Sequence, residues 1–400
     1  MLSEKEAKDQ KANSIREENV KEVNEVYNIG IRMEGKNNVW IIKLNPSGGL
    51  LTEKEHKKWI KMPGLEQKLK KEFNSNEIKK YREKYKKAEI ANLCKKEKIV
   101  AIGWILNPKD TWVKYSPKKQ INRKIYIKLY KKTPWPEENK NELNSSVKNF
   151  QELKGGDFCW VRDTSDKYYV CKIKGDWYYD NSKEAWAMDI AQRYNCKWVE
   201  VGDATETPAE VVKKLITRGP TVSKMDDKVL LDMSKYLFEG GGEKAVQKAV
   251  NEFDKNKIEY IKKDILSNLT QYDYEDFVGF YLQSKGYFIM PSTRYQSTKD
   301  YEFVAIRKEG MEKIAVQVKY HDKPNEKLDA KEKKYGNLSK TYKIYLACNN
   351  GVKDIDKIEN KRIVEINNDK LAEFIRNTPC LFLPRLKFLV MYKKHQEQIK

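Results

Sequence analysis

Two segments in the C-terminal third of the chain alternate apolar and polar residues with a period of two, which predicts β-strands. They are residues 300–306 (DYEFVAI) and 313–320 (KIAVQVKY), and a Lys-Glu-Gly-Met turn lies between them. Both segments are rich in Val, Ile, Phe and Tyr, so we expect them to pair as a hairpin. Ahead of them, residues 274–287 (YEDFVGFYLQSKGY) place apolar side chains at helical spacing and end at a glycine, which predicts an amphipathic helix.

Polar side chains recur on one face of each predicted strand. Alternation puts Asp300 and Glu302 on one face of the first strand, and Gln317 and Lys319 on one face of the second. The opposite face of the second strand carries Ile and Val. Placing a carboxylate, a carboxamide and an ammonium group among such residues is costly unless the groups serve each other or an ion. Glu275 falls in the first turn of the predicted helix.

A hard cation resolves this conflict. Mg²⁺ takes oxygen ligands in octahedral geometry and keeps several waters, so one carboxylate, one amide oxygen and a substrate phosphate form an adequate ligand set. Glu302 and Gln317 can supply these oxygens, and Lys319 can position the attacking water and offset charge in the transition state. Glu275 would hold an outer water or a second ion. The pattern therefore predicts a metal-dependent phosphodiester-cutting site that uses Mg²⁺ or Mn²⁺.

The segment resembles the Mrr-type branch of the PD-(D/E)xK restriction endonuclease superfamily. Glu275 lies eleven residues before Gly286, an acid opens the first core strand at Glu302, and Gln317 and Lys319 form the Gln-x-Lys of that branch. Further strand, strand and helix patterns follow at residues 342–348, 362–366 and 369–377. The resemblance implies a restriction-endonuclease-like α/β core, with a mixed sheet flanked by helices, and a Mg²⁺-dependent endonuclease activity.

One position departs from the family pattern. The family usually has Asp at the metal position, whereas this chain offers Glu302 with Asp300 two residues earlier. A longer side chain can still bind the ion, so either acid can be the main ligand. The same fold without activity, or an ordinary solvated strand face, remains the alternative interpretation.

Composition agrees with a nucleic-acid partner without identifying it. The chain has 80 Lys and Arg against 59 Asp and Glu, a net charge of +21, and such a surface attracts polyanions. Six cysteines without a C-x-x-C pair argue against structural zinc and against a secreted disulfide framework, and three histidines leave little for His-driven catalysis. No apolar run approaches 18 residues and the first residues are charged, so we expect a cytoplasmic protein without a membrane partner. Because the chain has no phosphate-binding loop, any nucleotide dependence would come from partner subunits.

Tryptophan marks the domain organisation. All nine Trp residues lie between Trp40 and Trp198, which implies two unrelated modules in an α+β or α/β multidomain protein. The predicted division is a charged N-terminal segment, a nucleic-acid reader, a helical connector, the nuclease domain and a basic tail, at residues 1–35, 36–225, 226–271, 272–384 and 385–400.

The first module shows short alternating strands separated by Gly-Asp turns, which predicts a small β-barrel. The order of these strands resembles PUA-like, EVE-type domains, which implies a pocket for a nucleobase swung out of its helix, often a modified one. A flipped base is held by aromatic stacking and by hydrogen bonds to its edge. Asp163 can accept such bonds, as can the acid among the candidate pocket residues, which are Trp40, Trp104, Trp160, Trp177, Tyr178 and Asp176. The alternative is that these Trp side chains fill the barrel core.

The sequence thus predicts a nuclease of bacterial or archaeal defence that cuts foreign or base-modified DNA. One active site cuts one strand, so double-strand cleavage needs two copies, and we expect a homodimer or a higher oligomer. Two other classes remain open: a nucleic-acid-binding protein without catalytic activity, and an RNA-directed reader or nuclease.

Overall fold

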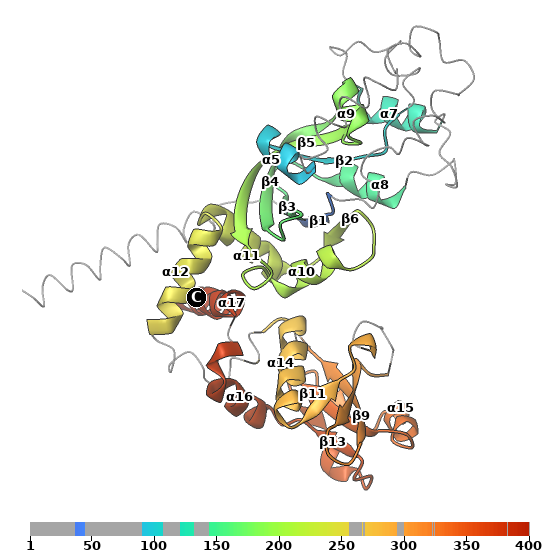
Figure 1. Ribbon diagram of the computed structural model, residues 1–400, viewed down its shortest axis with the longest axis vertical. Coiled ribbons are helices and arrows are strands. Elements are labelled where there is room, and N and C mark those ends of the chain that lie inside the picture. Colours follow the sequence, from blue (N-terminus) through green and yellow to red (C-terminus); the bar gives the residue numbers. More distant parts are fainter. Residues whose placement is uncertain are drawn as a thin grey trace, which may run out of the picture. The chain divides into compact units, whose positions relative to one another are not determined.

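The computed structural model forms two compact units, residues Met1–Ala245 and Val246–Lys400, and each is described here by itself (Figure 1). The charged segment 1–35 and most of the Lys-rich stretch before residue 90 lie outside the described residues. The residues described are 37–44, 90–106, 121–131, 144–255, 266, 269–293, 300–321, 323, 325–381 and 383–399.

The first unit is built on a six-stranded mixed sheet with the order β2-β5-β4-β3-β1-β6. Strands β1 and β3 are parallel and the other neighbouring pairs are antiparallel. Two edges, β2 and β6, remain among the described strands, so the described part of the chain shows an open sheet and no closed barrel. The strands are β1 (Val39–Ile42), β2 (Ile99–Ile102), β3 (Phe158–Arg162), β4 (Tyr168–Tyr179), β5 (Gln192–Gly202) and β6 (Val222–Met225).

Capping residues of the expected types start several helices of the first unit. Asn122, Asn144, Ser182 and Asp227 each accept a backbone N–H from the first turn of the helix that follows them. Their side chains satisfy donors that the helix itself leaves without a partner. The helices are α5 (Ile90–Glu97), α7 (Arg123–Tyr130), α8 (Ser145–Glu152), α9 (Lys183–Ala187), α10 (Ala209–Ile216) and α11 (Lys228–Glu239).

The second unit contains a five-stranded mixed sheet with the order β13-β11-β9-β8-β7. Strands β9, β11 and β13 are parallel, and β7 and β8 run antiparallel to their neighbours, so the expected mixed sheet and the expected β8–β9 hairpin are confirmed. A two-stranded ladder pairs β10 (Leu328–Asp329) with β12 (Val352–Lys353). The main strands are β7 (Tyr287–Ile289), β8 (Phe303–Arg307), β9 (Lys313–Lys319), β11 (Lys343–Cys348) and β13 (Ile363–Glu365).

Helices α14 and α15 lie on either side of this sheet in Figure 1. Helix α14 begins at Gln271, before the predicted start, because the Thr270 hydroxyl accepts the N–H of Asp273 at 3.2 Å and caps it. Glu275 therefore stands in the second turn rather than the first. The helices of the second unit are α12 (Glu243–Lys255), which crosses the boundary between the units, α14 (Gln271–Ser284), α15 (Lys333–Leu338), α16 (Asn368–Asn377) and α17 (Pro384–Ile399).

Residues 385–399 of the expected basic tail lie in helix α17. Leu386 and Phe388 are buried, so one side of this helix contributes to the core of the second unit. Arg385 Nε donates to Asp273 Oδ1 at 3.1 Å and joins α17 to the start of α14. Only 3% of the Asp273 side chain and 12% of the Arg385 side chain are exposed, so this ion pair is shielded from solvent.

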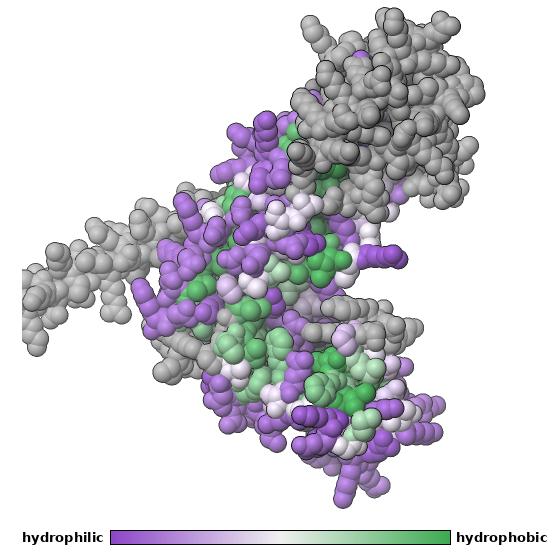
Figure 2. All heavy atoms as spheres, in the orientation of Figure 1, coloured by the Kyte–Doolittle hydropathy of each residue, from purple (hydrophilic) through white to green (hydrophobic). Residues whose placement is uncertain are grey.

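The surface agrees with the strongly charged composition. Hydrophilic residues cover much of the described surface on the face shown in Figure 2. Within the described residues, no helix has both the length and the apolar character needed to cross a membrane.

Candidate active site

Glu302 and Gln317 form the centre of the candidate site. Phe303 pairs with Val316 in the β8–β9 ladder, and the Glu302 N–H donates to the Val316 carbonyl at 2.8 Å, so the register extends one residue beyond β8. Glu302 therefore stands opposite Gln317, on the same face of the sheet. The Gln317 amide nitrogen Nε2 donates to Glu302 Oε1 at 3.0 Å. The predicted convergence of these two side chains is observed.

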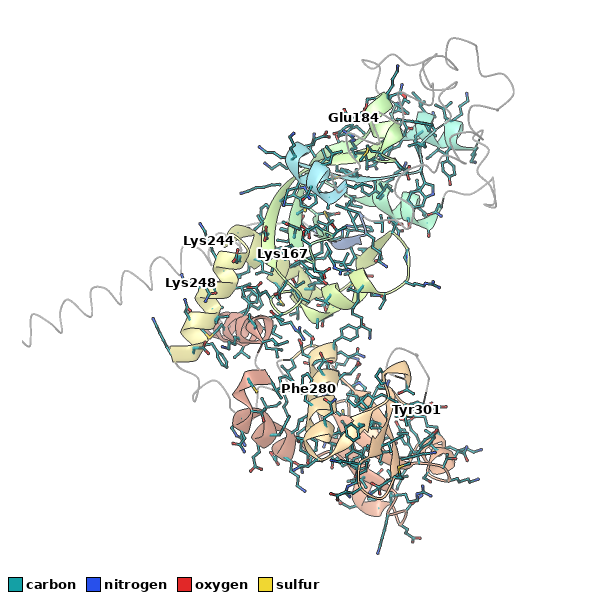
Figure 3. The ribbon with its side chains drawn as sticks, in the orientation of Figure 1. Lys167, Glu184, Lys244, Lys248, Phe280 and Tyr301 are labelled. Carbon is teal, nitrogen blue, oxygen red and sulfur yellow. The ribbon has the colours of Figure 1, made fainter. Side chains whose placement is uncertain are left out.

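Lys319 completes a hydrogen-bonded group of three. Its ammonium Nζ lies 3.4 Å from Glu302 Oε1, the same oxygen that accepts the Gln317 amide. The Lys319 side chain is 39% exposed, whereas Gln317 is 1% exposed. The site therefore runs from a buried amide to an ammonium group that solvent, or a phosphate, can reach. Tyr301, the residue before Glu302, lies beside the same sheet (Figure 3).

The Gln317 side chain leaves one buried atom without a partner. Its Oε1 accepts no hydrogen bond, although the atom is buried. The orientation of the amide is fixed because Nε2 donates to two groups that can only accept, Glu302 Oε1 and the Val318 carbonyl at 3.3 Å. An unsatisfied buried acceptor costs about 1–3 kcal/mol. Such an atom in a native structure points to a missing partner, such as a bound ion.

The donor set fits a hard divalent cation. A carboxylate and an uncompensated amide oxygen lie side by side, and Mg²⁺ prefers oxygen ligands and keeps waters for its remaining positions. Among the described residues, no group of three or more His, Cys, Asp or Glu side chains is arranged to hold a metal ion. Glu302 and Gln317 would therefore hold the ion together with waters and substrate.

The other two predicted site residues are not part of this hydrogen-bonded group. Among the described residues, no hydrogen bond joins Asp300 or Glu275 to Glu302, Gln317 or Lys319. Asp300 precedes β8, whereas the strand was predicted to begin with it.

Helix position explains why Glu275 stands apart. The Glu275 carboxylate accepts from Gln271 on its own helix at 2.9 Å. Tyr274 of α14 lies 6.1 Å, between ring centroids, from Tyr320, which alternation places on the face of β9 opposite to Gln317. Glu275 thus comes from a helix that packs on the other side of the sheet.

Two of the tryptophans proposed for a base pocket are core residues. The indole N–H of Trp40 donates to Asp157 Oδ2, and that of Trp160 donates to Ser234 Oγ, each at 2.9 Å. Both side chains are buried with their polar atoms satisfied. For these two positions the core-filling alternative describes the structure.

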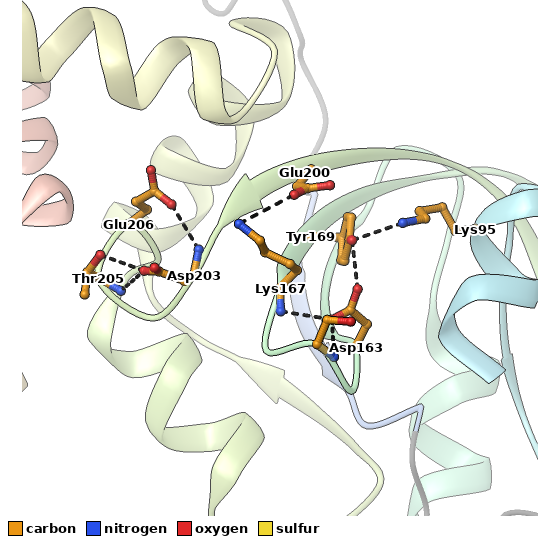
Figure 4. Close-up of polar contacts among 9 residues, drawn as sticks. Lys95, Asp163, Lys167, Tyr169, Glu200, Asp203, Thr205 and Glu206 are labelled. Atoms are coloured by element: carbon orange, nitrogen blue, oxygen red, sulfur yellow. Dashed lines mark hydrogen bonds and ion pairs between the residues drawn. The ribbon is translucent and has the colours of Figure 1, made fainter. Parts of the chain in front are cut away.

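Asp163 is occupied by its own turn. Figure 4 shows its Oδ1 accepting the backbone N–H of Lys167, and its Oδ2 accepting the Tyr169 hydroxyl at 2.8 Å. Burial and the neighbouring Asp163 carboxylate raise the pKa of Tyr169, so this hydroxyl stays protonated and keeps donating. The Tyr169 oxygen also accepts from Lys95 at 3.1 Å. These bonds leave Asp163 a structural role in joining β3, β4 and α5.

A β-bulge separates the remaining pocket candidates. The β4–β5 register shifts between Lys174 and Tyr178, where Gly175 has φ +78, a conformation that glycine tolerates best. The bulge buries Trp177 and leaves Asp176 exposed. The Tyr178 hydroxyl lies 3.4 Å from Asn195 Oδ1, on an exposed part of the sheet.

Trp177 and Trp104 share one aromatic neighbour. The Trp177 ring meets Tyr126 edge to face, with centroids 5.5 Å apart, and the Tyr126 hydroxyl donates to the Trp104 carbonyl at 2.9 Å. The Trp177 indole N–H is buried and has no hydrogen-bond partner among the described residues. This aromatic cluster of Trp104, Tyr126 and Trp177 is the best-supported location for a stacked base in the first unit.

No family model, curated protein or solved structure matches this chain, so its function is inferred from its own residues.

Proposed function

We propose that this protein is a cytoplasmic, Mg²⁺-dependent DNA endonuclease of the Mrr-like restriction type, in which the second unit cuts and the first unit reads nucleic acid. Mn²⁺ would replace Mg²⁺. The observation that carries the proposal is the uncompensated Gln317 Oε1 beside the Glu302 carboxylate, within reach of Lys319. An amide oxygen, a carboxylate and a lysine on adjacent strands are the groups that phosphodiester hydrolysis with a divalent cation requires.

Each residue of the group has a chemical task. Glu302 and Gln317 would hold the cation, which when bound lowers the pKa of water and neutralises charge on the phosphate. Lys319 would donate a hydrogen bond to a phosphate oxygen or to the attacking water and so stabilise the negative charge that grows in the transition state. Because the Lys319 ammonium is partly exposed while Gln317 is buried, a phosphate can approach from the lysine side.

The reader function of the first unit, a PUA-like module in this proposal, is supported by the aromatic cluster. Trp104, Tyr126 and Trp177 gather at one end of the sheet, and the Trp177 N–H awaits an acceptor. A nucleobase offers both a stacking face and acceptor atoms on its edge, so a flipped, modified base is the proposed ligand.

A basic surface of the first unit supports a nucleic-acid partner. Lys43 Nζ donates to the Thr217 carbonyl at 2.6 Å. Burial lowers the pKa of Lys43, and the neighbouring Lys214 ammonium lowers it further. Within the described residues, neither lysine forms a salt bridge. A phosphate between the two ammonium groups would relieve their repulsion and release counterions.

Cleavage assays with a matched variant pair test the proposal. Wild type, Glu302→Gln and the control Glu309→Gln, which changes an exposed acid in the β8–β9 turn, are incubated with plasmids carrying plain or modified cytosines. We expect Mg²⁺-dependent cutting by wild type and Glu309→Gln, inhibition by EDTA, and at least a hundredfold loss in Glu302→Gln. Equal cutting by all three proteins, or by none, would contradict the proposal. Linear product before relaxed circles disappear would support the expected homodimer or higher oligomer.

A nucleic-acid binder without hydrolytic activity is the second candidate. The described residues hold no group of three or more His, Cys, Asp or Glu side chains arranged for a metal, and this observation favours it. Such a protein would bind DNA or RNA in EDTA and cut neither. Competition between matched single-stranded RNA and modified duplex DNA separates an RNA-directed protein from a DNA-directed one.

A further inference from the structure

Two buried polar atoms in the second unit have no partner. In the described part of residues 246–400, the buried side-chain N and O atoms without a hydrogen bond are Gln317 Oε1 and the Tyr335 hydroxyl. Tyr335 lies in the middle of α15 and is fully buried. A buried hydroxyl without a partner costs about 1–3 kcal/mol, and a phenylalanine would fill the same space without that cost. The hydroxyl therefore calls for a partner that this structure does not show.

Tyr335 lies over the same face of the sheet as Gln317. In the parallel β9–β11 register, Leu346 is next to Gln317 and Cys348 is next to Lys319. Neighbouring residues in a ladder point to the same side, so these four side chains share one face. Tyr335 belongs to a buried cluster with Leu346 and Cys348, which places its ring over this face.

Asp300 acts on the Tyr335 hydroxyl through its charge. Extending the β8–β9 register by two further residues places Asp300 opposite Lys319, in line with Cys348. Burial raises the pKa of Tyr335, and the charges of Glu332 and Asp300 raise it further. The hydroxyl is therefore a neutral donor near neutral pH. Among the described residues, Asp300 makes no hydrogen bond, so its carboxylate is available as an acceptor.

We propose that Tyr335 is a positioning residue of the cation site, whose hydroxyl donates a hydrogen bond to Asp300 and turns that carboxylate toward the oxygens of Glu302 and Gln317. This inference rests on the proposed function and adds to it a second carboxylate for the ion. In the cation-bound state Gln317 Oε1 gains an ion and the Tyr335 hydroxyl gains an acceptor. Both buried atoms then cease to be unsatisfied, and the binding free energy of the ion includes the recovery of that cost.

Cation affinity and thermal stability test this role without relying on cleavage. Mn²⁺ binding is measured by titration calorimetry, and the melting temperature is measured in EDTA and in Mn²⁺, for wild type, Tyr335→Phe and the control Tyr345→Phe. The Tyr345 hydroxyl contacts the Tyr287 hydroxyl at 3.2 Å, so the control removes an oxygen that already has a partner. In EDTA we expect Tyr335→Phe to melt at or above the wild-type temperature, because the variant loses an unsatisfied group.

In Mn²⁺ the expected order reverses. Tyr335→Phe should bind Mn²⁺ about 10- to 100-fold more weakly than wild type, as for the loss of a residue that orients a metal ligand, and should gain less stability from the ion. Asp300→Asn should show the same weakening, and the double variant Tyr335→Phe/Asp300→Asn should be no weaker than either single variant. Tyr345→Phe should bind Mn²⁺ as wild type does.

The outcomes separate the two proposals. If wild type binds Mn²⁺ and cuts DNA while Tyr335→Phe binds the ion equally well, the positioning role is wrong and the nuclease proposal stands. If the Asp300→Asn and Tyr335→Phe effects add, the two residues act independently and the inference is likewise overturned. If wild type neither binds Mn²⁺ nor cuts DNA, the cation site itself is absent and both proposals fail.

Discussion

Lys319 Nζ and the Gln317 amide share one acceptor, Glu302 Oε1, at 3.4 and 3.0 Å. Two donors on one oxygen hold the Glu302 carboxylate in a single orientation. No described hydrogen bond reaches the other oxygen, Oε2, so it remains available for an ion or a water. A lysine and an amide that both donate to Glu302 thus fix a ligand in place before substrate arrives.

Replacing Lys319 by Ala should reduce cleavage roughly a hundredfold or more, because the variant lacks the donor that stabilises transition-state charge. Folding should survive, since the Lys319 side chain is partly exposed. Lys313→Ala, at the exposed start of the same strand, is the matched control and should cut as wild type does. Single-turnover rates and melting temperatures of both variants check this, and equal losses in the two would contradict a specific role for Lys319.

Gln317→Glu should make stability depend on cation and pH. The new carboxyl group would lie about as close to Glu302 as the amide does now, and two buried carboxylates so near each other cannot both ionise cheaply. Its pKa would be raised in the folded protein, so stability falls as the pH rises above the unfolded value of about 4.3. We expect a lower melting temperature at pH 8 in EDTA, with recovery in Mg²⁺ or at pH 5. An unchanged melting temperature in all three conditions would show that the two positions do not face each other.

Trp177→Phe should weaken binding of a modified base without unfolding the first unit. Phe keeps an aromatic face but lacks the N–H, and the loss of one neutral hydrogen bond of about 1 kcal/mol corresponds to roughly fivefold weaker binding. Trp160→Phe is the contrasting change: it breaks the bond to Ser234 and should lower the melting temperature while leaving base preference intact. Fluorescence anisotropy with plain and modified oligonucleotides measures both effects. A loss of preference in Trp160→Phe alone would move the pocket elsewhere.

Acid should weaken the second unit through Glu312. The bond from the Tyr287 hydroxyl lowers the pKa of the Glu312 carboxyl, burial opposes this shift, and Lys343 supports it. A lowered folded-state pKa means that the stabilisation is complete above the ordinary value of 4.5 and is lost as the pH falls through the lower, folded value. Glu312→Gln should therefore lose less stability than wild type between pH 7 and pH 3. Urea midpoints at the two pH values measure the difference, and parallel curves would contradict this assignment.

Lys214→Ala should reduce the salt dependence of DNA binding. If Lys214 and Lys43 together neutralise a phosphate, the slope of log K against log salt should become shallower by about 0.9 for each phosphate that the variant leaves without its lysine. Lys235→Ala is a suitable control because Lys235 already pairs with Asp232 at 3.6 Å. Binding in EDTA at several salt concentrations gives the slopes. Equal slopes for wild type and Lys214→Ala would remove this surface from the DNA path.

Local pattern predicted the centre of the site but not its surroundings. The alternation in β8 and β9 placed Glu302 and Gln317 on one face, because strand geometry depends on neighbouring residues alone. Tyr335 was missed because its position depends on how α15 packs over a sheet built from distant segments, and no spacing in the sequence records that.

Two other differences have local causes. The start of α14 was misplaced although Thr270 and Asp273 form the S/T-x-x-D/E pattern of a helix cap, a signal that could have found it. The tryptophans could not be ranked from sequence, since a bulge at Gly175 decides that Trp177 keeps an unpartnered N–H, while Trp160 finds Ser234 only through the tertiary fold.

The ion pair between Arg385 and Asp273 makes the last helix a condition for the first one. Asp273 sits in the opening turn of α14, and its counter-charge arrives from more than a hundred residues downstream. A protein shortened at Leu383 would leave that carboxylate shielded and unneutralised, a defect of about 3–5 kcal/mol for a buried pair that loses one member. Trimming these residues to improve expression or crystals would therefore erode the nuclease half at its entry helix, far from the point of truncation.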